Sequence, residues 1–426
     1  MTVQPSRPEA TRGDPLRRAA SSRTALWTTF VAVHGWLAWL GVVVMPTRAF
    51  WDVDLYRWWA SLALDAGRWP VLDDPWVYPA GALVPVLAPA LTGARTTVGY
   101  SVGWCVLVTV LDAVAVAVLL RAGPRAHPDR PVRTGRDRAP VPTGAWWWLA
   151  FLLALGPVAL GRLDAVVAPL CVVALAVGLR RPRVAAALLT AGAWVKVAPG
   201  ALLLPLAAVV RRPVRTVALP AAAVTAVVVG AVAAGGGAAR IAGFVTTQGG
   251  RGLQVESVTA TPWLLAAAVD ERVRIVFDTA LVTWEVAGPG TAATARALAV
   301  ALPVALLGLA VLLRRSTASP VDVLLRGSLA ATTVLLVVNA VGSPQLVGWL
   351  AAPVAVALTV APERRAWTRV AAGVLVLAAL TQVVFPFGAD GVVTGDPLFT
   401  AALVLRNAGL VVLLVVAVRS VSRPAP

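Results

Sequence analysis

Long apolar segments recur along almost the whole chain, and no other feature restricts the possible fold so strongly. A helix needs about 20 mostly apolar residues to cross the hydrocarbon core of a bilayer. Seven segments come close to that length: residues 25–46, 97–120, 216–234, 294–313, 327–341, 370–387 and 397–418. Hydrophobic residues make up 59% of the 426 and charged residues only 13%, a balance that a water-soluble protein of this size could not keep solvated. The sequence therefore predicts a polytopic membrane protein.

The basic residues lie in short groups between the apolar segments, and their distribution predicts a topology. The groups are residues 7–23, 121–138, 180–183, 211–215, 314–315, 326, 364–369 and 419–423, which together hold 25 arginines. Six acids lie in or beside these groups: Glu9, Asp14, Asp129, Asp137, Asp322 and Glu363. Such an excess is typical of cytoplasmic loops. We therefore expect both termini on the cytoplasmic side of the plasma (inner) membrane. The net charge of +17 then reflects topology and contact with anionic lipid, and it does not indicate a nucleic-acid partner.

These patterns predict an all-α membrane bundle of about twelve transmembrane helices, with two large external loops that contain amphipathic helices. The expected parts are a cytoplasmic tail (1–24), a membrane domain (25–418) with external loops at 47–95 and 235–291 and a cytoplasmic linker at 121–143, and a second cytoplasmic tail (419–426). The apolar segment 80–92 is too short to span and is expected to insert halfway from the external side. Cys105 and Cys171 lie in apolar segments, far from any metal-ligand spacing, and are expected to be small interior residues.

Residues 184–210 lie between two basic groups that should share one side, so this segment cannot be a single crossing. Lys196 and Pro199 divide it into two short helices that enter and return. Irregular backbone at membrane depth is tolerated where it is buried in protein or lines a wet cavity, so the break should mark the interior of a site. Lys196, the only lysine in the chain, could meet a phosphate there, or it could form a structural ion pair with Asp164.

Acidic and tryptophan residues are concentrated in residues 51–79, directly after the first apolar segment. The acids are Asp52, Asp54, Asp65, Asp73 and Asp74. A helix beginning here would place Asp52 and Tyr56 on one face, because they are four residues apart, with Trp59 beside them. This face could carry catalysis. Alternatively, the segment is an amphipathic lid whose carboxylates only face water.

Several short motifs, in a consistent order, resemble the GT-C glycosyltransferases that use polyprenyl-phosphate sugars. Within that class the chain is most similar to glycosyltransferase family 87, the actinobacterial α-1,2-mannosyltransferase-like group. The motifs are Asp52, Val53 and Tyr56; Gly67, Pro70 and Asp73; Tyr78, Pro79 and Ala80; residues 161–164 (GRLD); residues 193–199 (AWVKVAP); residues 254–257 (QVES); and residues 343–345 (SPQ) with Trp349. The chain departs from the family pattern at Val77, where a glutamate is usual, and at Arg162, where a glutamine is usual.

The resemblance implies an inverting transfer of a sugar, mannose above all, from a polyprenyl-phosphate donor to an external glycolipid or glycan acceptor. Asp52, or Asp54, would be the base, and Lys196, Arg251 and Arg406 would bind the donor phosphate. The expected substrate contacts are Tyr56, Asp73, Asp74, Tyr78, Asp164, Glu256 and Gln345. No cofactor and no metal-ligand set is predicted beyond the lipid donor, and a requirement for a divalent ion stays open.

Other interpretations of these residues stay open. The glycine-rich segment with Arg251 and Glu256 could be a plain flexible loop, and Arg406 with Asn407 could serve helix packing. Asp112, alone in an apolar segment, is expected to be a structural partner for a neighbouring helix. The whole chain could instead be a secondary transporter or flippase, because transporters also have broken helices. It could also be a non-catalytic envelope-assembly protein.

Overall fold

In the part of the chain that the structure describes, seven helices are long and apolar enough to cross a membrane. A computed structural model describes residues 22–123, 141–249, 251–279, 281–361 and 364–422. By length and composition the candidate spans are Arg23–Val44 (α2, continuing as a π-helical turn), Thr97–Ala122 (α5), Val214–Ala234 (α10, Leu219–Ala234, with the π-helical turn before it), Thr291–Arg315 (α13), Pro320–Val337 (α14), Arg365–Phe387 (mostly α16, Arg364–Gln382) and Pro397–Val421 (α18). They correspond one to one to the seven apolar segments of the sequence, which confirms a helical membrane bundle.

Shorter helices complete the bundle and its loops. They are Trp51–Ala66 (α3), Leu83–Leu91 (α4), Thr143–Leu155 (α6), Asp164–Val177 (α7), Pro182–Val195 (α8), Leu203–Val209 (α9), Gly243–Gly249 (α11), Thr261–Ala266 (α12), Ala351–Val360 (α15) and Ala389–Thr394 (α17). The number of about twelve crossings stays a prediction, because these helices are shorter than a full span. The predicted tails 1–24 and 419–426 and the linker 121–143 lie largely outside the described residues.

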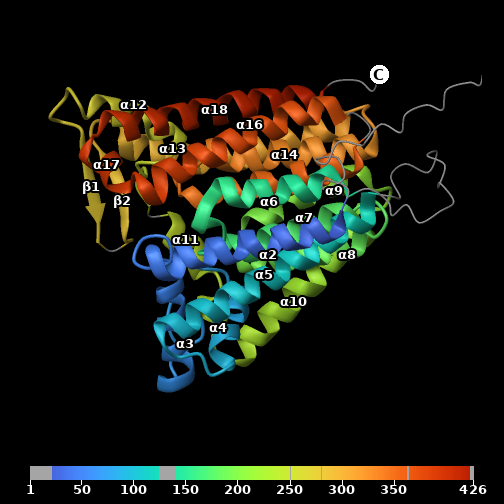
Figure 1. Ribbon diagram of the computed structural model, residues 1–426, viewed down its shortest axis with the longest axis horizontal. Helices are drawn as coiled ribbons and strands as arrows, with labels where there is room; N and C mark the ends of the chain where they lie inside the picture. Colours follow the sequence, from blue (N-terminus) through green and yellow to red (C-terminus); the bar gives the residue numbers. More distant parts are fainter. Residues whose placement is uncertain (1–21, 124–140, 250, 280, 362–363, 423–426) are drawn as a thin grey trace, which may run out of the picture.

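The second large loop contains a β-hairpin that was not expected. Strands Arg274–Asp278 (β1) and Thr283–Ala287 (β2) pair antiparallel, with Phe277 opposite Trp284. The sequence alternates apolar and polar residues too briefly here to stand out from the surrounding apolar chain. Among its described residues, the loop also contains the short helices α11 and α12 and two 3-10 helices, Ala238–Arg240 and Val258–Ala260. In Figure 1 the hairpin, α12 and α17 lie at one end of the bundle, and the C-terminus lies at the other.

The spanning helices differ in how much of their surface is covered by protein. In the most apolar window of α14, 78% of the residues are buried, against 11% in α10 and in α13. Large side chains on α13 such as Val300, Val304 and Leu307 are exposed. Exposed apolar helix faces of this kind are stable against lipid and not against water. The bundle therefore has a protein-packed centre at α14 and lipid-facing helices around it.

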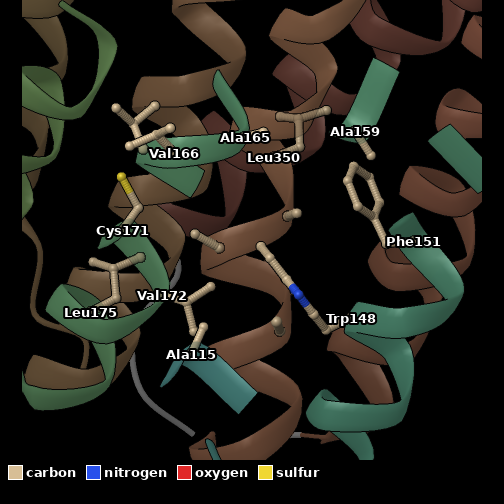
Figure 2. Packing of buried hydrophobic residues seen from close by; sticks show 14 of the residues in the cluster. Ala115, Trp148, Phe151, Ala159, Ala165, Val166, Cys171, Val172, Leu175 and Leu350 are labelled. Atoms are coloured by element: carbon tan, nitrogen blue, oxygen red, sulfur yellow. The ribbon is translucent and has the colours of Figure 1, made fainter. Parts of the chain in front are cut away.

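Part of the core lies where α5, α6, α7 and the start of α15 meet (Figure 2). Trp148 and Phe151 of α6 point toward α7 and toward Leu350, and Val172 packs near Ala115 of α5. Cys171 is buried in the same cluster as a free thiol, as the sequence led us to expect. Close packing here fixes the turn between α6 and α7, which leads directly into the site described next.

Candidate functional site

A cavity of about 1250 Å³ opens between the two large loops and the broken segment at Lys196. One side, called here the α3 wall, is formed by Asp52, Trp59, Tyr78, Arg162 and Lys196. The opposite side, called the loop wall, is formed by Arg251, Gln254, Glu256 and Gln345. Six of the residues singled out in the sequence line this cavity: Asp52, Tyr78, Lys196, Arg251, Glu256 and Gln345.

Helix α3 gives Asp52 its position. The helix begins at Trp51, directly after the first span, and ends at Gly67, whose φ of 67° suits a residue without a side chain. Tyr56 lies one turn after Asp52 and is buried beneath the cavity, where its hydroxyl accepts a hydrogen bond from the Leu163 amide at 3.3 Å. The predicted Asp52 and Tyr56 face is therefore confirmed as a helix face packed against the bundle.

Aromatic rings fill the floor of the α3 wall. The ring centroids of Tyr56 and Tyr78 are 6.2 Å apart, and the Trp59 ring lies 5.9 Å from Tyr78 in an edge-to-face arrangement. Burial, together with the nearby Asp52 carboxylate, raises the pKa of both tyrosines above their usual range. The two phenols therefore stay neutral and can donate hydrogen bonds.

Asp52 is paired with Arg162, a residue that the sequence analysis had noted only as a departure from a family pattern. The Arg162 Nε lies 3.1 Å from Asp52 Oδ2, and the two side chains are 7% and 20% exposed. Arg162 also donates to the backbone carbonyls of Ala49 at 2.7 Å and Gly161 at 2.9 Å, and its guanidinium lies 5.6 Å from the centre of the Phe385 ring. Arg162 thus fixes the start of α3 against the turn before α7.

Lys196 lies at the predicted break. Helix α8 ends at Val195, Lys196 is extended, and a short 3-10 helix, Ala198–Leu202, leads into α9. The Lys196 Nζ lies 2.8 Å from Oδ2 of Asp164, and the Trp349 indole donates to Oδ1 of the same carboxylate at 2.7 Å. The predicted Lys196 and Asp164 pair is therefore present, with Lys196 in the cavity wall and Asp164 behind it.

The loop wall is attached to α18 through Arg406. The Arg406 Nη1 donates to Glu256 Oε2 at 2.9 Å, and the Arg406 Nη2 donates to the Glu256 backbone carbonyl. Asn407 Oδ1 accepts from Arg406, and the Asn407 amide donates to Thr261 Oγ1 at 2.9 Å. Arg406 does not line the cavity. The alternative role in helix packing therefore accounts for its contacts, and the predicted role in phosphate binding has no geometric support.

Arg251 is the cavity-lining cation with a free polar atom. Its Nε is buried without a hydrogen-bond partner among the described residues, and no carboxylate of that part of the chain forms an ion pair with it. The neighbouring Gly252 lies against Glu285, whose carboxylate accepts from the Gly252 amide at 3.1 Å. A Cβ at Gly252 would lie 2.0 Å from that carboxylate, so a side chain there would displace the Glu285 carboxylate.

Gln254 holds the loop wall together. Its Oε1 accepts from the Gly342 amide at 3.0 Å, and its Nε2 donates to Thr283 Oγ1 at 2.9 Å. The backbone of the same segment adds to the hairpin, because the Val255 amide donates to the Trp284 carbonyl at 3.0 Å. Gln254 and Gln345 therefore face the cavity from a braced segment and not from a plain flexible loop.

Three predicted acids lie outside the cavity. Asp54 pairs with Arg57 at 2.7 Å, which lowers the pKa of Asp54 below its usual value, and its side chain is 45% exposed. Asp73 accepts from the Trp69 amide at 2.7 Å, and Asp74 pairs with Arg68 at 2.5 Å on the surface. These contacts lie on the surface of α3 and in the turn after it. The three acids therefore do not join Asp52 in the cavity.

Asp112 has the structural partner that was expected. Its Oδ2 lies 3.0 Å from Nε2 of His34, whose Nδ1 lies 2.9 Å from the Phe30 carbonyl. Both side chains are buried between α2 and α5, away from the cavity-lining residues. This pair connects two spanning helices.

Sequence reasoning missed Arg162, Gln254 and Trp349 as site residues. Arg162 could have been found from a charge inside an apolar stretch two residues before Asp164, since such charges are costly without a partner. Gln254 carries no such signal. Among the described residues, no three His, Cys, Asp or Glu side chains lie close enough together to hold a metal ion. Comparison with protein-family models and with curated proteins finds no match to this chain.

Proposed function

We propose that the protein is a membrane glycosyltransferase that uses a polyprenyl-phosphate sugar as donor, with mannose as the first sugar to test. The acceptor is a glycolipid or glycan hydroxyl on the external side of the plasma membrane. One observation carries the proposal: the Asp52 carboxylate shares a cavity inside an apolar bundle with three cations, Arg162, Lys196 and Arg251. Ionisable groups at such depth are costly unless they serve a function.

In the proposed reaction Asp52 is the general base. The acceptor hydroxyl oxygen forms a bond to the anomeric carbon from the face opposite the phosphate, and its proton passes to Asp52. The bond from the anomeric carbon to the phosphate oxygen breaks, and polyprenyl phosphate leaves with the bonding electrons. Attack from the opposite face inverts the configuration. Asp52 is favoured over Asp54 because only Asp52 lines the cavity.

The cations would stabilise the phosphate. Lys196 and Arg251 both line the cavity, so both could contact a phosphate bound in it. Fixed positive charge acts strongly on a leaving phosphate in a site that excludes water.

The apolar part of the cavity suits a lipid chain. Four residues of α13 line it: Ala295, Leu298, Ala299 and Leu302. The same helix is mostly uncovered by protein, so a chain lying along it would pass from the cavity to the surrounding lipid. A donor that is a sugar phosphate at one end and a hydrocarbon at the other matches this division of polar and apolar lining.

The proposal is tested by incubating the purified full chain in nanodiscs with radiolabelled polyprenyl-phosphate mannose and candidate acceptors. Asp52→Asn should lower product formation by about 10²–10⁴-fold, as expected for loss of a general base. Asp65→Asn is the matched control, because Asp65 forms an exposed pair with Arg95 outside the cavity. Equal rates for wild type and Asp52→Asn would refute the assignment of the base.

The broken segment at Lys196 also favours a second candidate, a transporter, since discontinuous helices line transporter sites. Proteoliposomes distinguish the two. If labelled donor crosses the bilayer chemically unchanged while no acceptor becomes labelled, transport replaces transfer. If Asp52→Ala retains every measurable activity of the wild type, a non-catalytic role in envelope assembly replaces both.

A further inference from the structure

Arg162 is placed to contact both the proposed base and an anion in the cavity. Its side chain lines the cavity, and its Nε holds Asp52 at 3.1 Å. NH1 is fixed by the carbonyls of Ala49 and Gly161, so the guanidinium cannot move far. A guanidinium has five N–H donors, and these three contacts leave others for a ligand.

The charges of the proposed reaction change in a way that concerns this pair. A polyprenyl-phosphate sugar is a phosphodiester with one negative charge, whereas the departing monoester carries nearly two at neutral pH. Over the same step Asp52 gains a proton and loses its charge. Arg162 therefore loses its anionic partner at the moment when the phosphate gains a charge.

The other cations of the cavity do not undergo this change. Lys196 stays paired with Asp164, whose second oxygen is held by Trp349, and neither group takes part in proton transfer. Arg251 has no ion pair with a described carboxylate either before or after the step. Lys196 also lies within electrostatic reach of Asp52, but among the described residues only Arg162 forms an ion pair with the carboxylate that the reaction neutralises.

We propose that Arg162 changes partner during turnover: it pairs with Asp52 in the resting site and with the phosphate of the leaving lipid once Asp52 has taken the acceptor proton. Arg162 thereby couples the base to the leaving group and is a positioning residue for both. This inference rests on the proposed function. The ligand is a lipid-linked phosphomonoester. To bind it, the Arg162 guanidinium must exchange Asp52 for the phosphate, so the two anions compete for this side chain.

The competition can be measured without turnover. The probe is polyprenyl monophosphate, titrated into wild type and variants in nanodiscs and followed by tryptophan fluorescence, since Trp59 and Trp349 line the cavity. Asp52→Asn frees Arg162 and should tighten binding about tenfold, whereas Arg162→Gln should weaken it about tenfold. In the Arg162→Gln background, Asp52→Asn should change the affinity by less than about twofold. Arg162→Lys, which keeps the charge, should recover part of the lost affinity.

Matched controls and competitors define the ligand. Arg95→Gln and Asp65→Asn, the two halves of the exposed pair, should leave affinity unchanged. Inorganic phosphate in excess should displace the probe only weakly if the lipid chain contributes, and full displacement at equal concentration would identify free phosphate as the ligand and overturn the lipid assignment. Phosphatidylglycerol should not compete. If it does, a general anionic-lipid site replaces the proposal.

Turnover provides an independent readout. Arg162→Gln should lower kcat about 100-fold and change KM for the donor by less than about tenfold, because Arg162 meets the phosphate mainly as it leaves. A partner exchange is refuted if Asp52→Asn binds the monophosphate no more tightly than wild type, even when wild type transfers sugar. If the binding pattern appears and no acceptor is ever labelled, the exchange stands and the transfer function fails. Absence of saturable binding to wild type overturns both.

Discussion

The two walls of the cavity hold their acids with similar exposure but with different arginines. Asp52 and Glu256 are 20% and 17% exposed. Arg162, the partner of Asp52, faces the cavity, whereas Arg406, the partner of Glu256, lies behind the loop wall in α18. The two carboxylate–arginine pairs therefore serve different purposes. In the α3 wall the pair is accessible to a ligand, and in the loop wall it attaches a segment to the bundle.

The comparison predicts the largest loss of stability at Arg406. Arg406→Leu removes the donors to Glu256 and leaves its carboxylate buried without a partner, which typically costs about 3–5 kcal/mol. Thermal unfolding of the detergent-solubilised protein, followed by circular dichroism, measures the effect. Arg406→Lys should lose less, because it keeps one donor and the charge. Unchanged stability in Arg406→Leu would mean that the loop wall does not depend on α18.

A second test concerns the contact between the loop wall and the chain after α14. A Cβ on Gly342 would lie 2.1 Å from the Ser257 amide nitrogen, so Gly342→Ala should displace residues beside Glu256 and cost about 1–3 kcal/mol. Gly373→Ala is the matched control. Gly373 lies in α16 with nothing within 4 Å of an added Cβ, and alanine there should be neutral or slightly stabilising. Thermal unfolding of both variants side by side decides whether the packing is as tight as described.

Asp52→Asn should have a smaller effect on stability than on activity. Asparagine keeps an oxygen that can accept from Arg162, so the loss is about 1 kcal/mol, the size of one hydrogen bond. The measurement is the unfolding midpoint of the variant beside that of Arg406→Leu. If Asp52→Asn were less stable than Arg406→Leu, the Asp52–Arg162 pair would also be holding the bundle together, and the proposed difference between the two pairs would be wrong.

The smallest effect is expected at Asp54, and it depends on pH. The Arg57 guanidinium lowers the pKa of Asp54 in the folded state, so the pair stabilises the protein above the unfolded value, about 3.9, and this contribution disappears as the pH falls through the lower folded value. Because the pair is well exposed, the contribution is a few tenths of a kcal/mol. The midpoints of wild type and Asp54→Asn should differ slightly at pH 7 and converge once the pH lies below the folded pKa of Asp54. A difference that persists in acid would point to a cause other than the ion pair.

The spans could be predicted from the sequence because each depends on local composition. The seven apolar segments and the break at Lys196 are properties of runs of 15 to 27 residues, and the helices follow them. The start of the buried helix was harder to predict. Residues 327–341 were expected to span, yet α14 begins earlier, at Pro320, because Arg326 is buried and donates to the Ser420 carbonyl at 3.0 Å. A charge that finds a partner in a distant helix carries no local signal.

The site was predictable only in part, for the same reason. Lys196 stood out because it is a charge inside an apolar segment, and Asp52 because it lies in an acid-rich segment directly after one. Tyr78 was expected only from the family resemblance. The pairing of Asp52 with Arg162 joins residues 110 positions apart, and no spacing in the sequence specifies it. Asp73 and Asp74 were expected from the family resemblance to contact substrate. The turn after α3 places them outside the cavity, where they contact the Trp69 amide and Arg68.

Lys196 has a practical consequence because it is the only lysine of the chain. Reductive methylation with ¹³C-formaldehyde would introduce isotope at this side chain and at the terminal amine alone. The methyl resonance would then report directly from the cavity wall beside Asp164. Its chemical shift could follow the arrival of donor, acceptor or lipid product in a membrane protein that otherwise offers very little spectral resolution.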